Sequence, residues 1–133
     1  MILNKASILL VDDEPLVLEM FESILTQDGF SVQVAPSARD ALNLIENKYF
    51  DVLVCDVKLE EFDGFDIMEI ARNKSSEIGV VLITGAPSEE DSLRAEKLNA
   101  SYLSKPIGFD LLLSSVEVAL ERSRSSAGKL AHL

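Results

Sequence analysis

SILLVDDEP, residues 7–15, joins an apolar run to three acidic residues and a proline. The first part, SILLV (7–11), is typical of a strand that is buried on both faces of a parallel sheet. Pro15 is favourable in the first turn of a helix, so we expect a helix to begin there. The acids between them repel one another, at about 4 kcal/mol for two charges about 4 Å apart at an effective dielectric near 20. Such a cluster at the end of a buried strand predicts a bound cation.

The alternation of strand and helix patterns continues along the chain. Short apolar runs predict five strands, at residues 7–11, 30–35, 51–55, 79–84 and 100–104. Apolar residues at helical spacing predict five helices, which begin near Pro15, Ser37, Phe65, Ser88 and Phe109. Strict alternation implies parallel strands, right-handed crossovers and helices on both faces of the sheet. The predicted fold class is therefore α/β, a doubly wound parallel sheet in a single domain.

Residues at the expected helix ends support these boundaries. Ser37 and Ser88 each precede an acid by three residues, which is the spacing of a helix-capping box. Gly29 follows the first helix, and Asn99 follows the fourth. Both residue types tolerate the left-handed backbone conformation that ends many helices.

Composition limits the classes of function. The chain has 133 residues, is 47% hydrophobic and 26% charged, and carries a formal net charge of −11. This charge argues against direct nucleic-acid binding, which favours a basic face, and is compatible with a cation or a basic partner. The single cysteine, Cys55, excludes an internal disulfide, and the single histidine, His132, argues against a histidine-based triad or zinc site. We find no membrane span and no signal peptide, and therefore expect a cytoplasmic protein.

The ends of the predicted strands carry the candidate site. Asp12 and Asp13 follow the first strand, Asp56 follows the third, Thr84 ends the fourth and Lys105 follows the fifth. In a doubly wound sheet, ligands bind at the carboxyl ends of the strands. We therefore expect three carboxylates, one hydroxyl and one ammonium group to meet at one edge.

This set of groups suits phosphoryl transfer. Carboxylate oxygens are the ligands that Mg²⁺ prefers, and the ion would relieve the repulsion among the acids. A free aspartate can act as a nucleophile and form an aspartyl-phosphate. Mg²⁺ and Lys105 could neutralise the phosphoryl oxygens, and the Thr84 hydroxyl could donate a hydrogen bond to one of them. A cis peptide bond before Pro106 would aim Lys105 inward, but sequence does not show the isomer.

The chain resembles the receiver domain of bacterial two-component response regulators. Four stretches carry the resemblance, in this order: VDDEP (11–15), DVLVCDVKLEEFDGF (51–65), VLITG (81–85) and ASYLSKPI (100–107). No single motif is specific, but their ordered set is. The resemblance covers Ser7 to Arg122 and implies a flavodoxin-like (βα)5 fold with strand order 2-1-3-4-5. We expect a receiver domain at residues 1–122 and a C-terminal tail or linker at residues 123–133.

The resemblance also implies roles for individual residues. Asp56 would accept a phosphoryl group from a histidine kinase or a histidine phosphotransfer protein. Asp12, Asp13, Asp56 and the backbone carbonyl of Lys58 would hold Mg²⁺. Thr84 and Lys105 would contact the phosphoryl group. A receiver of this kind is a signalling domain and not an enzyme in the ordinary sense, since it catalyses only its own phosphorylation and dephosphorylation.

Further implied roles concern the output. Thr84 and Tyr102 would act as a switch, and the signal would leave through the face of the fourth helix, fifth strand and fifth helix. Lys58 and Ala86 would tune the phosphoryl lifetime, for which we hypothesise that Lys58 supplies a nearby cation. The downstream protein or output domain is not identified by the sequence, and homodimerisation is compatible with it.

Two features leave alternatives open. Glu60 stands where the family usually has proline, which leaves room for a phosphate-independent interaction domain on the same fold. A small Mg²⁺-dependent phosphatase is a second alternative, but such enzymes usually keep an acid where this chain has Lys58. A flavodoxin-like cofactor binder is a third, and it is disfavoured because acids replace a phosphate-binding loop. Structural explanations also exist: acids favour a helix start, and Tyr102 could simply pack with a solvated hydroxyl.

Overall fold

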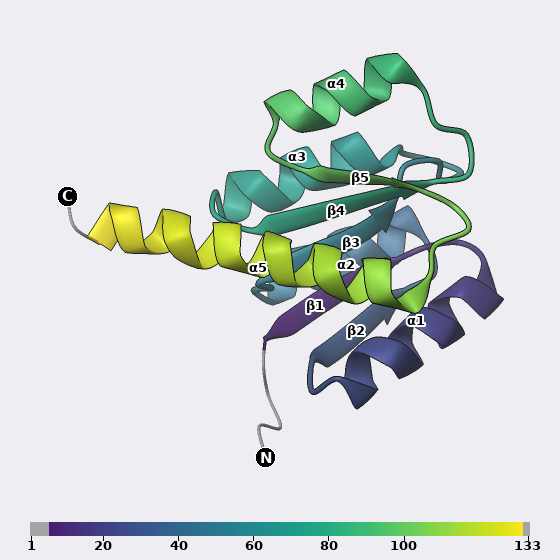
Figure 1. Ribbon diagram of the computed structural model, residues 1–133, viewed down its shortest axis with the longest axis horizontal. Coiled ribbons are helices and arrows are strands. Elements are labelled where there is room, and N and C mark those ends of the chain that lie inside the picture. The colour runs from purple at the N-terminus through teal and green to yellow at the C-terminus, as the bar shows by residue number, and fades with distance from the viewer. Residues whose placement is uncertain (1–5, 132–133) are drawn as a thin grey trace.

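The computed structural model describes residues 6–131 of the chain, with side chains for residues 6–124. Five parallel strands form one sheet in the order β2-β1-β3-β4-β5 (Figure 1). The strands are β1 (Ser7–Val11), β2 (Ser31–Ala35), β3 (Val52–Asp56), β4 (Gly79–Thr84) and β5 (Ser101–Ser104). The helices are α1 (Pro15–Gln27), α2 (Ala38–Asn47), α3 (Gly64–Lys74), α4 (Glu89–Lys97) and α5 (Phe109–Ala131). The predicted doubly wound fold and its strand order are confirmed.

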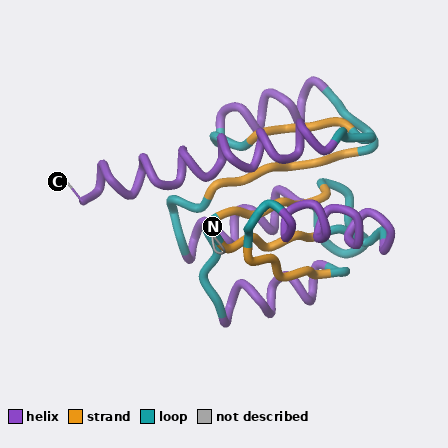
Figure 2. Tube along the Cα trace, turned by 60° about the horizontal axis from the view of Figure 1, so that its bottom comes forward, coloured by secondary structure: helices purple, strands orange, loops and turns teal. Residues whose placement is uncertain are grey.

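The sheet lies between two layers of helices (Figure 2). Helices α1 and α5 cover one face, where Phe21 and Leu112 belong to one core cluster. Helices α2, α3 and α4 cover the other face, where Ile45 and Phe65 belong to a second cluster. Successive residues of β1 alternate between the two clusters and are all but fully buried after Ser7. This double burial explains why the strand sequences are continuous apolar runs.

The predicted helix ends are confirmed. Pro15 occupies the first turn of α1, and Gly29 has a φ of 100° just after that helix. Ser37 and Ser88 accept hydrogen bonds from the backbone N–H groups three residues later, at the starts of α2 and α4. Asn99 has a φ of 55°, so it adopts the left-handed conformation that the sequence suggested.

The C-terminal segment is helical as far as the structure describes it. Residues 123–131, which we expected to form a tail or linker, continue α5 without interruption, and their role as a tail or linker stays a prediction. Ser123 is buried, so the packed part of the helix also extends past Arg122. The reason is cooperativity: once a helix has nucleated, each further residue adds one hydrogen bond. Residues 1–5 and 132–133, which include His132, lie outside the described residues. None of the helices in the described part of the chain combines the length and apolar character that a bilayer crossing needs.

Candidate functional site

The carboxyl edge of the sheet brings the predicted residues together. Strands β1 and β3 are neighbours, so Asp12, just after β1, lies beside Asp56, the last residue of β3. Strands β4 and β5 continue the edge, and the backbone N–H of Lys105 donates to the carbonyl of Thr84 at 2.8 Å. The peptide bond between Lys105 and Pro106 is cis.

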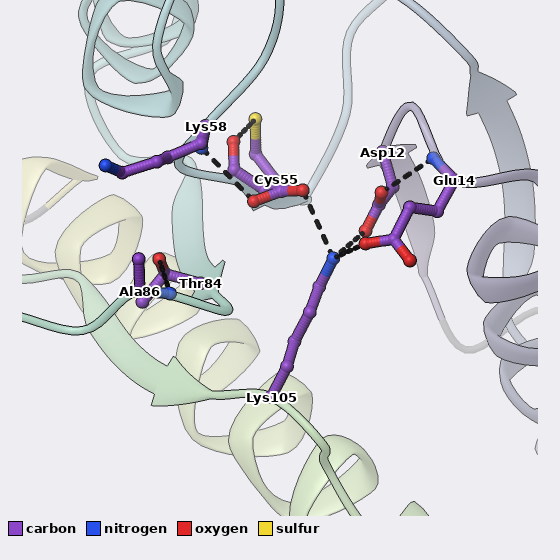
Figure 3. A network of polar contacts seen from close by, with 8 residues as sticks. Asp12, Glu14, Cys55, Lys58, Thr84, Ala86 and Lys105 are labelled. Atoms are coloured by element: carbon purple, nitrogen blue, oxygen red, sulfur yellow. Dashed lines mark hydrogen bonds and ion pairs between the residues drawn. The ribbon is translucent and has the colours of Figure 1, made fainter.

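Lys105 is the centre of the polar network (Figure 3). Its ammonium nitrogen lies 2.9 Å from Asp12 Oδ2, 2.8 Å from Glu14 Oε1 and 3.1 Å from Asp56 Oδ2. Asp12 and Asp56 are almost fully buried, whereas Glu14 is exposed. The charges of the two buried pairs attract each other more strongly than those of the exposed pair, because water screens them less, but their burial also costs desolvation energy.

The acids also form a cluster that could hold a metal ion. One carboxylate oxygen from each of Asp12, Asp13 and Asp56 lies within 4.8 Å of the others. Asp12, Glu14 and Asp56 pair with the single ammonium group of Lys105, and Asp13 adds a fourth carboxylate beside them, so the cluster keeps an excess of negative charge. Oxygen donors of this kind at a partly open site fit a hard divalent cation such as Mg²⁺.

Electrostatics distinguish Asp56 from an ordinary surface aspartate. Burial raises the pKa of its carboxyl group, and the neighbouring charge of Asp12 raises this pKa further. Hydrogen bonding and attraction from Lys105 oppose that rise. Burial alone would lower the pKa of the Lys105 ammonium, but its bonds to Glu14 and Asp12 outweigh burial and hold that pKa above its usual value. Lys105 therefore stays protonated wherever the acids are ionised.

Backbone contacts fix the position of Asp56. Its Oδ1 accepts a hydrogen bond from the backbone N–H of Lys58 at 3.2 Å. The loop that follows closes through a bridge between Lys58 and Asp63, and the N–H of Gly64 donates to the carbonyl of Val57 at 2.7 Å. Gly64 packs so closely that a Cβ atom there would lie 2.6 Å from the backbone oxygen of Asp56. The first turn of α3 is thus pressed against the strand end that carries the central carboxylate.

The predicted switch residues occupy the other side of the edge. Thr84 is fully buried, and its Oγ1 accepts a hydrogen bond from the backbone N–H of Ala86 at 3.0 Å. The Tyr102 hydroxyl accepts one from the backbone N–H of Ser88, at the start of α4, at 3.1 Å. The side chain of Lys58 extends away from Lys105 (Figure 3). The switching and lifetime roles of these residues stay predictions.

Two contacts were not predicted from the sequence. Glu14 was counted in the acid cluster but was not expected to pair with Lys105, and it is one of three carboxylates that do so. The run of three acids indicates a charged cluster, since it exceeds what a helix start needs, but it does not show which acid pairs with Lys105. The capping box between Asp63 and Asp66, which sets the start of α3, was also missed. It uses aspartate at both positions, whereas the usual pattern has serine or threonine followed by glutamate or glutamine.

Comparison with known proteins decides the family. The family model of the response regulator receiver domain matches residues 8–117. The chain belongs to this family. It is accordingly a receiver domain of a two-component signalling system, and its acid cluster fits the phosphoacceptor role of such domains.

Relatives of this receiver domain include transcriptional regulators. ZraR of Salmonella typhimurium is 34% identical over 131 residues, which cover 98% of this chain and 30% of that protein. AlgB of Pseudomonas putida is 34% identical over 125 residues, which cover 93% of this chain and 28% of that protein. The chain thus spans about three tenths of the length of these relatives.

Solved receiver structures superpose closely. A CheY-like receiver domain protein from Methanospirillum hungatei JF-1 has a TM-score of 0.83 and 29% identity, with 90% of this chain and 97% of that chain covered. The beryllofluoride-activated NtrC4 receiver domain, which was solved as a dimer, has a TM-score of 0.82 and 29% identity, with 88% and 98% covered. The strand order and helix layers of the receiver domain are therefore shared with proteins of low sequence identity.

Proposed function

We propose that Asp56 is the phosphoacceptor of this receiver domain. The observation that supports it is the meeting of Asp12, Asp13 and Asp56 with the ammonium group of Lys105, from three separate strand ends. An oxygen of Asp56 attacks the phosphorus of a phosphohistidine on a histidine kinase or phosphotransfer protein. The P–N bond breaks, the imidazole leaves and takes up a proton, and an acyl phosphate remains on Asp56.

The neighbouring residues hold the charges of this reaction. Asp12, Asp13, Asp56 and the backbone carbonyl of Lys58 would bind Mg²⁺, which supplies positive charge for the phosphoryl oxygens when it is present. The ammonium group of Lys105 exchanges one of its carboxylate partners for a phosphoryl oxygen, whose negative charge it stabilises. The hydroxyl of Thr84 donates a hydrogen bond to the same group.

The signal passes from this site to α4. When Thr84 turns toward the phosphoryl group, its bond to the N–H of Ala86 breaks and the 85–88 loop moves. Tyr102, which now bonds the N–H of Ser88 at the other end of that loop, takes up the vacated space. A differential stabilisation of a few kcal/mol is enough to shift such an equilibrium. The face of α4, β5 and α5 then changes its affinity for a downstream protein, an output domain or a second copy of the chain.

Lys58 and Ala86 border the site and set the lifetime of the acyl phosphate. We expect Lys58→Ala to change the decay rate of phosphorylated Asp56, because the Lys58 side chain adds a cation at the loop. Loss of the ³²P label after removal of the donor measures the rate. An unchanged half-life would end this proposal for Lys58.

Acetyl phosphate tests the phosphoacceptor without the kinase. We expect a Mg²⁺-dependent shift of the wild-type protein on a Phos-tag gel and a mass increase on Asp56 after peptide mapping. Asp56→Asn should show neither, while Asp51→Asn, which changes an exposed aspartate near the start of β3, should behave as the wild type. Equal labelling of wild type and Asp56→Asn would refute the assignment.

Two of the alternatives predict different results. A phosphate-independent interaction domain would neither bind Mg²⁺ nor become labelled. A phosphatase would release phosphate over many turnovers, and Lys58 stands where such enzymes usually place the acid for that step. We propose a cytoplasmic location, in keeping with a kinase partner and with regulatory relatives.

A further inference from the structure

Helices α3 and α4 enclose an open groove of about 520 Å³ that includes no residue of the acid cluster. On the α3 side, Phe65, Met68 and Arg72 line the groove. Met68 and Arg72 lie about one and two turns after Phe65, so the three residues share one face of the helix. On the α4 side, Lys97 and Leu98 follow Arg94 by three and four residues, which is about one turn. The groove is therefore formed by two helix faces that point toward each other.

The charge of the groove is opposite to that of the chain. Three basic residues, Arg72, Arg94 and Lys97, line it with one acid, Glu69. The whole chain has 23 acids and only 12 basic residues. A local excess of positive charge on so acidic a protein favours a negatively charged partner at this place.

Apolar groups lie beneath these charges. Phe65 and Met68 form the buried floor, and Leu98 is 40% exposed at the wall. The guanidinium carbon of Arg94 lies over the Phe65 ring, 4.2 Å from its centroid. Arginine covers apolar surface with its stem while its charge stays available, so Arg94 can move aside and still pair with an incoming acid.

Two of the three cations, Arg94 and Lys97, are available to bind further groups. Neither Arg94 nor Lys97 pairs with a carboxylate in the part of the chain that the structure describes. Arg72 donates to the backbone carbonyls of Leu98 and Asn99, and its Nε is buried with no hydrogen-bond partner among the described residues. Arg72 is thus held by the end of α4 and adds its positive charge to the groove, while the exposed side chains of Arg94 and Lys97 carry the N–H groups that an incoming carboxylate can reach.

We propose that the α3–α4 groove docks an acidic amphipathic helix of a partner protein. The helix would place apolar side chains against Leu98 and the floor, and carboxylates against Arg94 and Lys97, where the charge of Arg72 also attracts them. The 11 residues of α3 span about 16 Å, which matches about three turns of a docked helix. A second copy of the chain is disfavoured as the occupant, because two proteins of net charge −11 repel each other. This surface lies on the side of α4 that faces α3, away from β5.

A designed peptide tests the proposal. The probe is a fluorescein-labelled helix of about 14 residues, or about 21 Å, with leucines on one face and glutamates on the other. A control peptide has the same sequence with glutamine in place of each glutamate. Fluorescence anisotropy gives the Kd for the wild type, for Arg94→Glu/Lys97→Glu and for Arg39→Glu/Lys48→Glu, which makes the same charge change at exposed positions around α2. Lys97→Glu alone, in which the contact of Arg94 with Phe65 is kept, serves as the variant least disturbed in fold.

We expect the glutamate peptide to bind the wild type at least about tenfold more tightly than the glutamine peptide does. The groove double variant should lose about tenfold or more in affinity, Lys97→Glu part of that, and the α2 variant less than about twofold. Backbone amide shifts on peptide addition should concentrate in residues 65–73 and 94–98. Equal binding of the two peptides, equal loss in both double variants, or shifts centred elsewhere would overturn the proposal. A third result would also overturn it: the wild type does not bind the peptide but forms a dimer, and Arg94→Glu/Lys97→Glu abolishes that dimer. The occupant of the groove would then be a second copy of the chain.

Discussion

Gly64→Ala tests how closely α3 is pressed against the phosphoacceptor strand. A Cβ atom at this position would lie 2.6 Å from the backbone oxygen of Asp56 and 3.0 Å from the Cα atom of Val57. Both are backbone atoms at the end of a buried strand, so neither can move aside as a flexible side chain would. The alanine must push the first turn of α3 away from the sheet.

Two effects of opposite sign set the change in the free energy of unfolding caused by Gly64→Ala. Overpacking in a closely packed region costs about 1–3 kcal/mol, and a contact with fixed backbone belongs near the upper end. Alanine is favoured over glycine inside a helix by about 1 kcal/mol, and this gain is smaller in the first turn. We therefore expect Gly64→Ala to lower the free energy of unfolding by about 1–2 kcal/mol.

Urea unfolding followed by circular dichroism at 222 nm measures this change. Gly108→Ala is the matched control, because nothing lies within 4 Å of a Cβ atom there, and it should stay within about 0.5 kcal/mol of the wild type. Labelling by acetyl phosphate should also slow in Gly64→Ala, since the carbonyl it displaces belongs to Asp56. A Gly64→Ala variant as stable as the wild type would refute the close packing of α3 on β3.

Three further predictions concern charges. Burial and the charge of Asp12 raise the pKa of Asp56, so the Asp56 carboxyl group holds its proton more tightly in the folded state than in the unfolded state. The free energy of unfolding therefore falls as the pH rises from the ordinary pKa of 3.8 through the raised pKa. Asp56→Asn should therefore melt at a higher temperature than the wild type at pH 7, and the difference should vanish below pH 3.8; a constant difference would contradict this. Asp13→Asn should weaken Mg²⁺ binding in calorimetry by about tenfold or more, since the ion loses a carboxylate, and unchanged affinity would remove Asp13 from the site. Lys74→Met should cost about 2 kcal/mol in urea unfolding, because Lys74 donates to three carbonyls at the end of α2, while the exposed Lys48→Met should be nearly neutral.

Much of the fold follows from local sequence signals. The runs SILLV and GVVLIT are long enough and apolar enough to specify strands buried on both faces, and Ser37, Ser88 and Asn99 mark helix ends by residue type. These signals involve neighbours in the chain, so they can be read without a structure. The helix over residues 123–131 has no such local signal, since it is supported by continuity with the packed part of α5.

The composition of the site was predictable, but its pairing was not. Strand ends in a parallel sheet share one edge, which placed Asp12, Asp56, Thr84 and Lys105 together. Which acids Lys105 bonds depends on side-chain geometry across separate loops, and this is why Glu14 was overlooked. The α3–α4 groove had no local signal either, because it arises only when two helices with ordinary amphipathic patterns lie side by side.

The two ends of α3 are anchored differently from those of its neighbour, and this has a mechanical consequence. At one end Gly64 rests on the Asp56 carbonyl, and at the other Arg72 and Lys74 fasten the ends of α4 and α2. Helix α4 itself buries only Ala95 among its residues. A displacement that starts at Asp56 therefore moves α3 little, because α3 is held at both ends. We expect α4 to rotate about its C-terminal end, which Arg72 binds, so that its N-terminal end near Ser88 moves furthest.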